Sequence, residues 1–320
     1  MTITHLVTHS GGFHADEVLS SVILTRLFPH AQIVRTRDAK WTTPSVEKII
    51  YDVGRDYDAV AQIFDHHQRP TPLRIDEQPY SSFGLIWAHY GHDYVRALDI
   101  PEADIDDIHA SFDKGFVLPI DLVDNGALAP ATAGDLASLT LPSLIGSLKP
   151  VFDNDSPTAD DDGFAAAVNI ARAFVEGSLA GKAAKRRAEA MVIEAIEKTG
   201  EGRVLELPRG MPFRGAIEKT GADHLLFVVN PRDDDWAIGG IRITGNSFEQ
   251  RADLPAAWAG LTDEALEEAC GVKGAKFCHN GLFIAVAATR EAALAMAELA
   301  VVEAGERAVL TATLAPRPAF

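Results

Sequence analysis

The first 27 residues constrain the fold more than any other part of the chain, because they join a strand pattern directly to a helix pattern. Residues 2–8 alternate and are rich in β-branched side chains, which predicts a strand. The pair Gly11 and Gly12 interrupts that strand, and residues 16–27 then place apolar side chains at helical spacing. Strand, glycine turn and helix predict an α/β sheet, in which ligands bind at the carboxyl ends of the strands.

Acidic residues and histidines follow the other predicted strands as well. We expect strands at residues 32–36, 48–51 and 59–64, and a short apolar stretch at residues 115–120. Ionised carboxylates and neutral imidazoles bind Mn, Fe, Co or Zn at neutral pH without an altered pKa. Three of the four groups follow strands, so we expect them to converge on a divalent metal site. The four groups are His9, His14 and Asp16; Asp52; Asp65, His66 and His67; and Asp121 and Asp124.

A pair of serines, Ser81 and Ser82, begins a helix pattern for which Gly91 is the stop signal. Serine at the start of a helix is first of all an N-cap. A helix amino terminus beside a metal site is also a favourable place for an anion. Contact of the two serines with a phosphate is therefore the alternative.

The 320 residues predict two domains. We place the boundary at the end of a long alanine-rich helix, residues 164–198, which follows an acidic linker at about 150–163. The first domain, residues 1–198, contains the metal-binding candidates, and residues 199–320 form a smaller α/β domain. The basic run 182–187 on the long helix is either a solvated face or a phosphate track. In the smaller domain we expect strands at residues 203–207, 225–229 and 236–243, and helices at residues 261–269 and 290–304.

Charge and cysteine content limit the partners and the compartment. A net charge of −17 repels polyanions at long range, which argues against a broad surface that coats nucleic acid but allows a local basic site. Cys270 and Cys278 form no CxxC pair, which is typical of reduced thiols in a cytosol. No apolar run reaches the roughly 18 residues of a membrane span, and the amino terminus lacks the pattern of a targeting segment. We expect a cytoplasmic protein without a membrane partner.

Six sequence blocks resemble one protein family. The order of acids and histidines is similar to that of the DHH phosphoesterase superfamily, and the match is closer to the melanocyte-proliferating-gene (MYG) family, a group labelled metal-dependent protein hydrolases. The resemblance implies a DHH-phosphoesterase-like parallel-sheet domain, joined by a helical linker to a smaller α/β C-terminal domain. It also implies two divalent metal ions, Mn or Mg, and a 3′-to-5′ exonuclease activity on RNA. The blocks are residues 8–17, 51–54, 64–68, 81–87, 120–126 and 277–281.

His14 departs from the superfamily pattern, because it stands where the first aspartate would be. A site richer in nitrogen would favour Mn, Co or Zn over Mg. Asp52 is expected to bridge the two ions. Asp65 and Asp121 are expected to orient an imidazole, and His67 to contact the phosphate or the leaving group. One ion would bind to His9, His14 and Asp52, and the other to Asp16, Asp52, His66 and Asp124.

Substrate contacts are expected from both domains. His279 and Asn280 lie where DHH relatives have a substrate-binding loop. Arg37, Arg242 and Lys276 are the candidate cations for a substrate phosphate. A homo-oligomer is compatible with the sequence.

Three functions compete on this sequence. The first is a metal-dependent exonuclease on RNA or short oligonucleotides. The second is a small-molecule phosphohydrolase acting on a nucleotide, pyrophosphate or a cyclic dinucleotide, which the acidic surface favours. The third is a metal-binding regulatory protein without catalysis. The chain has no HExxH motif and no serine or cysteine triad signature, so peptide hydrolysis has no support.

Overall fold

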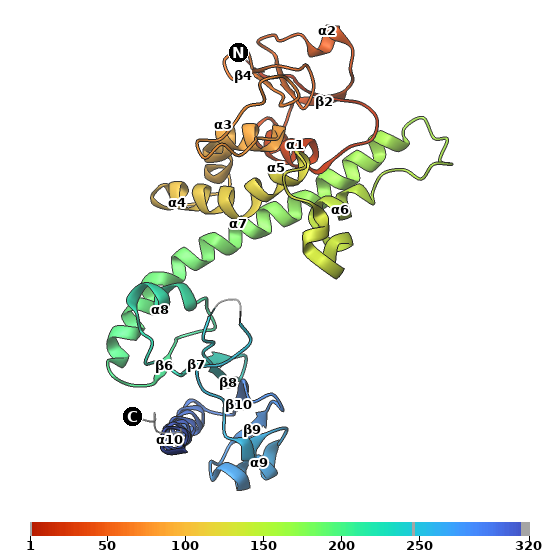
Figure 1. Cartoon of the computed structure of the whole chain (residues 1–320). Helices are drawn as coiled ribbons and strands as arrows, with labels where there is room; N and C mark the ends of the chain where they lie inside the picture. Colours follow the sequence, from red (N-terminus) through yellow and green to blue (C-terminus); the bar gives the residue numbers. More distant parts are fainter. Residues whose placement is uncertain (1, 245–246, 315–320) are drawn as a thin grey trace, which may run out of the picture. The chain divides into compact units, whose positions relative to one another are not determined.

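The first part of the chain contains a five-stranded sheet, ordered β2-β1-β3-β5-β4 (Figure 1). The computed structural model describes residues 2–244 and 247–314. Strands β1, β2, β3 and β5 run parallel, and β4 pairs antiparallel with β5. The predicted parallel sheet is thus confirmed, and β4 is an addition that its two residues did not signal. The strands are β1 (His5–Thr8), β2 (Gln32–Arg35), β3 (Lys48–Tyr51), β4 (Tyr57–Asp58) and β5 (Ile63–Phe64).

The two faces of this sheet are buried against different partners, because successive strand residues point to opposite sides. On one face, Leu6 and Ile49 belong to the main core, which helices cover. On the other face, Val7 and Ile50 form a smaller cluster with Trp41 of the short helix α2 (Ala39–Thr42). Burial on both faces explains why these strands are continuous apolar runs.

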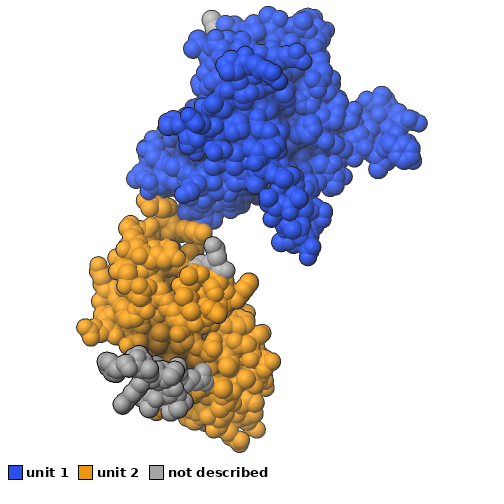
Figure 2. Space-filling view, in the orientation of Figure 1, with its two compact units in different colours: residues 1–183 blue, residues 184–320 orange. Residues whose placement is uncertain are grey.

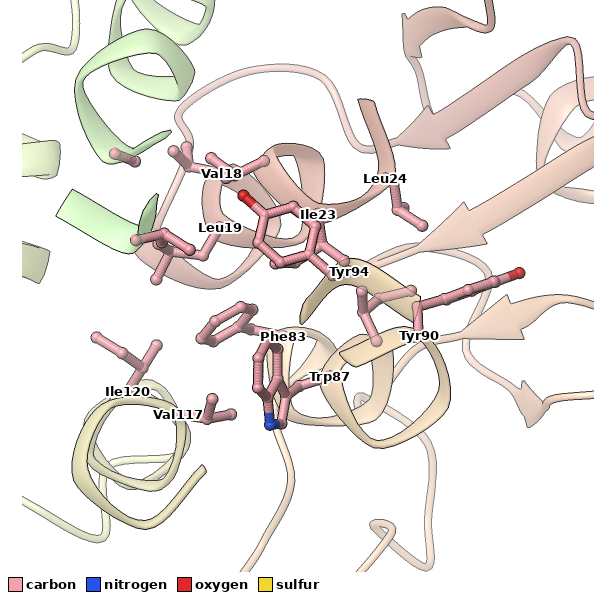
Figure 3. Packing of buried hydrophobic residues seen from close by; sticks show 14 of the residues in the cluster. Val18, Leu19, Ile23, Leu24, Phe83, Trp87, Tyr90, Tyr94, Val117 and Ile120 are labelled. Atoms are coloured by element: carbon pink, nitrogen blue, oxygen red, sulfur yellow. The ribbon is translucent and has the colours of Figure 1, made fainter. Parts of the chain in front are cut away.

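Helices α1 (Ala15–Leu27) and α3 (Ser82–Arg96) form the centre of the main core. Figure 3 shows Leu19 and Ile23 of α1 beside Phe83 and Trp87 of α3. The remaining helical segments of this part are α4 (Glu102–Phe112), a π-helical stretch η1 (Asp113–Val117), α5 (Leu118–Asp124), the 3₁₀ segment η2 (Pro130–Leu139) and α6 (Leu141–Gly146).

The prediction that Gly91 ends its helix is wrong, because α3 continues to Arg96. A β-carbon at position 91 would lie 2.7 Å from the ring of His109 on α4 and 2.8 Å from Trp87. Glycine at this position therefore allows two helices to approach closely and does not stop the first one.

Helix α7 (Ala159–Thr199) continues from the first unit into the second. The chain divides into two units, residues 1–183 and 184–320 (Figure 2). The sequence placed the boundary at residue 198, where the helix pattern ends. The division lies inside the helix because its earlier turns pack Leu179 into the core of the first unit, whereas Val192 and Ile196 join a cluster of the second.

The second unit has its own five-stranded sheet, ordered β6-β7-β8-β10-β9. Only β6 and β7 pair in parallel, and the other neighbours are antiparallel. The smaller α/β unit predicted from the sequence is thus confirmed, although helix α8 was not foreseen. Its elements are β6 (Val204–Glu206), α8 (Arg214–Thr220), β7 (Phe227–Arg232), β8 (Asp235–Gly240), η3 (Ala256–Trp258), α9 (Asp263–Cys270), β9 (Ala275–Cys278), β10 (Ile284–Ala287) and α10 (Arg290–Leu314).

Across the described residues, no helix combines the length and the apolar character that crossing a bilayer requires. Both cysteines are free thiols, and Cys278 is buried.

Candidate metal centre

The carboxyl ends of three parallel strands meet at one edge of the first sheet, and acidic or histidine residues follow each of them. His9 follows β1, Asp52 follows β3, and Asp65, His66 and His67 follow β5. The start of α1 adds the carboxylates of Asp16 and Glu17, and the end of α5 adds that of Asp124. The cavity at this edge has a volume of about 500 Å³, and its lining includes His9, His14, Asp16, Arg37, Asp52, Asp65, His66, His67 and Asp124.

Asp52 lies at the middle of this group, and its two carboxylate oxygens face different histidines. Oδ2 lies 3.2 Å from Nε2 of His9, and Oδ1 lies 3.4 Å from Nε2 of His66. The backbone of Asp52 is left-handed, with φ of 54°, a conformation that aspartate tolerates better than most residues. Burial alone would raise the pKa of Asp52, but hydrogen bonds from His66 and His9 hold it well below its usual range.

Both of these histidines are oriented through their other ring nitrogen. Nδ1 of His9 lies 3.2 Å from the carbonyl oxygen of Ser10, and Nδ1 of His66 lies 3.4 Å from Oδ1 of Asn125. The amide nitrogen of Asn125 donates to two backbone carbonyls, which assigns its oxygen to the side of His66. In the neutral tautomer that this arrangement favours, Nε2 has a free lone pair toward the carboxylates, as a metal ligand requires.

Asp16 is the strongest sign that the group binds a cation. Its side chain is 1% exposed, and neither carboxylate oxygen has a hydrogen-bond partner among the described residues. Burial, together with the charges of Asp52 and Asp124, raises the pKa of Asp16 well above its usual range. Buried carboxylates are almost always paired or bound to metal. The residues therefore fit divalent metal, because a cation would satisfy both oxygens and relieve the repulsion.

The potential ligand atoms form four overlapping sets, two of which lack Asp52. In the first of these two groups, atoms of His9, His14 and Glu17 lie within 4.8 Å of one another, and in the second, atoms of Asp16, His66 and Asp124 do so. Asp52 contacts the histidine of each group, as described above. In the second group, Nε2 of His66 lies 3.3 Å from Oδ2 of Asp124 and 3.8 Å from Oδ2 of Asp16.

Glu17 is a member of this site that the sequence did not indicate. Both of its oxygens accept hydrogen bonds of 2.9 Å from the backbone N–H of His14, and Oε1 lies 3.0 Å from Nε2 of His9. Burial alone would lower the pKa of His9, but hydrogen bonds to Asp52 and Glu17 raise it to about 10. A glutamate in the first turn of a helix is an ordinary capping residue, so only the fold reveals its contact with His9.

Asp65 and His67 form a pair beside the two groups. Oδ1 of Asp65 accepts a hydrogen bond of 2.7 Å from Nδ1 of His67, and Oδ2 accepts one of 2.6 Å from the backbone N–H of Arg55. The side chain of His67 is 55% exposed, so its ring faces the open cavity. The hydrogen bond to Asp65 is the main reason why the pKa of His67 is raised.

Asp121 does not orient an imidazole, contrary to the prediction. Its carboxylate accepts hydrogen bonds of 2.6 Å from Arg74 and 2.6 Å from Ser81, and one of 3.1 Å from the backbone N–H of Gly84. Arg74 also binds Asp113 with two hydrogen bonds. Asp121 therefore fixes the start of α3 and does not reach the cavity.

Ser81 occupies the N-cap position of α3, as predicted, but the hydroxyls of the two serines have other partners than expected. Ser81 and Ser82 are fully buried, and the Ser81 hydroxyl bonds to Asp121 instead of capping its own helix. The hydroxyl of Ser82 donates to Oδ1 of Asp52 over 3.4 Å. Because both hydroxyls are enclosed and engaged by carboxylates, direct contact with a phosphate is not available to them.

The candidate cations and the predicted substrate loop lie in different parts of the structure. Arg37 lines the cavity of the metal centre. In the second unit, Lys276 forms an ion pair of 2.8 Å with Asp235, and the guanidinium of Arg242 lies 4.9 Å from the ring centre of Phe248. In the predicted loop, Asn280 is exposed and Nδ1 of His279 accepts a hydrogen bond of 2.9 Å from the N–H of Gly281. A role in substrate binding stays a prediction for these residues.

Comparison with known proteins identifies the family. The model of the uncharacterised protein family UPF0160, called MYG1_exonuc, matches residues 5–301. A MYG1 protein of Schizosaccharomyces pombe is 32% identical, over 93% of this chain and 97% of its own length. The chain belongs to this MYG1 family. The human relative, a protein named MYG1 exonuclease, is 32% identical over 91% of this chain and 84% of its own length. The resemblance predicted from the six sequence blocks is thus confirmed.

Solved structures are similar only at a low level. RecJ of Thermus thermophilus in complex with Mn²⁺ is 14% identical, with a TM-score of 0.28, over 94% of this chain and 52% of that protein. The complex of the same protein with Mg²⁺ has a TM-score of 0.27.

Proposed function

We propose that this protein is a divalent-metal-dependent phosphodiesterase, a 3′-to-5′ exonuclease that shortens RNA or short oligonucleotides. The observation that supports this most is Asp16, a buried carboxylate that has no hydrogen-bond partner among the described residues and lies in one group of potential metal ligands with His66 and Asp124. Membership of the MYG1 family supports the choice of reaction, because mammalian members are named exonucleases. Phosphate-ester cleavage is also a reaction that paired metal ions promote, because they stabilise both the attacking and the leaving oxygen.

Asp52 is the residue on which the site depends most in this proposal. Asp52 would help to hold both ions, one together with His9, His14 and Glu17 and the other together with Asp16, His66 and Asp124. When bound, the two ions, for which we propose Mn²⁺ over Mg, Co or Zn, would neutralise phosphate charge and activate a water molecule. Asn125 and the carbonyl of Ser10 hold the two imidazoles in the tautomer that this binding needs.

His67 is the proposed proton donor to the leaving oxygen. Its Nδ1 is engaged by Asp65, so Nε2 is the ring nitrogen left to face a substrate in the cavity. The raised pKa that Asp65 causes favours the protonated ring near neutral pH, which suits a general acid. Asp65 thus positions His67 and raises its pKa, without touching the substrate itself.

The experiment that tests the proposal is parallel incubation of the Mn-loaded protein with short RNA, short DNA, pyrophosphate and dinucleotides. RNA labelled at its 5′ end should shorten one nucleotide at a time, with mononucleotide products. Asp52→Asn, which removes one charge at nearly constant volume, is the control and should abolish the reaction. Release of products only from the 5′ end, or cleavage in the middle of the chain, would contradict the proposal.

A small-molecule phosphohydrolase is the second candidate. The observation in its favour is the net charge of −17, which opposes the approach of a long polyanion. Hydrolysis of pyrophosphate or a cyclic dinucleotide, with no shortening of RNA, would support it in the same experiment. Binding of Mn without any hydrolysis would instead support a regulatory protein.

A further inference from the structure

An apolar cavity of about 350 Å³ lies along α5, the helix that ends at Asp124. A smaller cavity of about 190 Å³ lies between it and the metal centre, and its lining includes His14, Asp124 and Lys149. The two cavities share Ile120, Val123 and Pro142 in their linings, and the smaller one shares His14 and Asp124 with the metal centre. A continuous path of lining residues therefore leads from the proposed metal ligands to an apolar recess.

Lys149 is a cation beside this path that the sequence did not indicate. Its side chain covers the glycine turn after β1, because a β-carbon at Gly12 would lie 3.9 Å from its Cε and 4.0 Å from its Nζ. The side chain is half-buried, and within residues 2–244 and 247–314 its ammonium has no carboxylate partner. In so acidic a protein, a cation that faces a cavity without an internal partner is suited to an external anion.

The larger cavity has the size and the surface that a nucleobase needs. Its walls include Phe116, Pro119 and Leu141, and its volume is near the lower end of the range for small-molecule sites. Two hydroxyls, those of Thr132 and Thr140, are the main polar side-chain groups in the lining. Bases stack on apolar and aromatic groups without regard to sequence, since each base presents a flat face.

We infer that this cavity receives the base of the nucleotide whose phosphate is bound at the metal centre, with Lys149 neutralising that phosphate. The inference rests on the proposed function, because it takes the substrate to be a nucleotide chain. The apolar walls contact the face of the base and offer few groups to its edges. The subsite therefore accepts all four bases with similar affinity.

The test is calorimetric binding of two ligands to the full-length, Mn-loaded protein. Adenosine 5′-monophosphate and ribose 5-phosphate have the same charge and differ only in the base. We expect the nucleotide to bind about tenfold more tightly, as the stacking of one base provides. Thr132→Trp, which fills the cavity from an exposed position, should abolish that difference and leave the affinity for ribose 5-phosphate unchanged.

Two further variants make the test specific. Ser138→Trp introduces the same side chain at an exposed position of η2 that does not line the cavity, so it should keep the tenfold preference. Lys149→Met should weaken both ligands equally, and Lys149→Arg should restore them, because this residue acts on the phosphate alone.

Equal affinities of the wild type for the two ligands, or no binding of either, would overturn the inference. An unchanged preference in Thr132→Trp would do so as well. These outcomes are separate from failure of the proposed function, because a protein that hydrolyses no phosphodiester can still prefer the nucleotide in a binding experiment. Conversely, an active exonuclease without that preference would retain its function and lack this subsite.

Discussion

The two five-stranded sheets of this chain differ in whether the polar residues that follow their strands come together at one edge. In the first unit, four neighbouring strands are parallel, so the residues that follow them meet at one edge. In the second unit, most neighbours are antiparallel, so successive strand ends lie at opposite edges. The first sheet therefore gathers His9, Asp52 and His66 in one cavity, whereas Lys276 in the second pairs locally with Asp235.

The burial of polar side chains also differs between the two units. Asp16, Glu17 and Asp52 are almost completely enclosed, and their charges act on one another at short distance. The second unit's His279 is exposed, and its ring lies 4.3 Å from the ring of Phe283. A concentration of buried charge is a property of functional sites, because stability alone would disfavour it. The comparison predicts that chemistry depends on the first sheet and that the second affects only binding.

Removal of the shared carboxylate should have the largest effect. Asp52→Ala is expected to lose bound Mn and to lower kcat/KM by at least about 10³-fold, because both ligand groups use this residue. Metal content by elemental analysis and hydrolysis of short RNA are the measurements, with circular dichroism to show that the fold is intact. Full activity in this variant would disprove a dinuclear site centred on Asp52.

Removal of the residue that orients His66 should have a smaller effect. Asn125→Ala is expected to weaken Mn binding by about 10- to 100-fold, the range found when partners of ligand histidines are lost. Asn154→Ala, in an exposed loop of the same unit, is the matched control and should bind Mn like the wild type. Equal affinities of the two variants would show that Asn125 only links α5 to its neighbours.

Metal binding should release protons near neutral pH. The pKa of His9 is raised to about 10 in the metal-free protein, so its ring is protonated at pH 7 and must lose that proton to bind an ion. Affinity for Mn should therefore rise between pH 6 and 9, by up to about tenfold per unit for each proton displaced. Calorimetry in buffers with different ionisation enthalpies measures the release. A heat of Mn binding that does not change with the ionisation enthalpy of the buffer would contradict the proposed role of His9.

A substitution in the second unit should have the smallest effect. His279→Ala is expected to raise KM for short RNA by about two- to tenfold with kcat and bound Mn unchanged, because it removes binding and no catalytic group. His224→Ala, at another histidine of the same unit, is a control for the loss of an imidazole. If KM is unaltered, His279 has only a structural role and contributes to neither catalysis nor substrate binding.

Local pattern predicted which residue types lie at the sheet edge. Strand and helix periods are properties of neighbouring residues, so the sequence alone places His9, Asp52 and His66 at strand ends. The six blocks likewise identified the MYG1 family, since they are runs of adjacent residues. The short strand β4 and helix α8 were missed because two and seven residues are too few to establish a period.

Tertiary structure decided what each of these side chains contacts. Asp121 and Asp124 have similar neighbours in sequence, and a spacing of three residues places them on nearly the same side of α5, about one turn apart. Asp121 nevertheless contacts Arg74 and the start of α3, whereas Asp124 lines the cavity. Glu17 contacts His9, and Lys149 lines the neighbouring cavity, only because packing brings α1 and the segment after α6 close to this edge. Contacts between residues distant in sequence depend on how the helices pack on the sheet, and no local period encodes that packing.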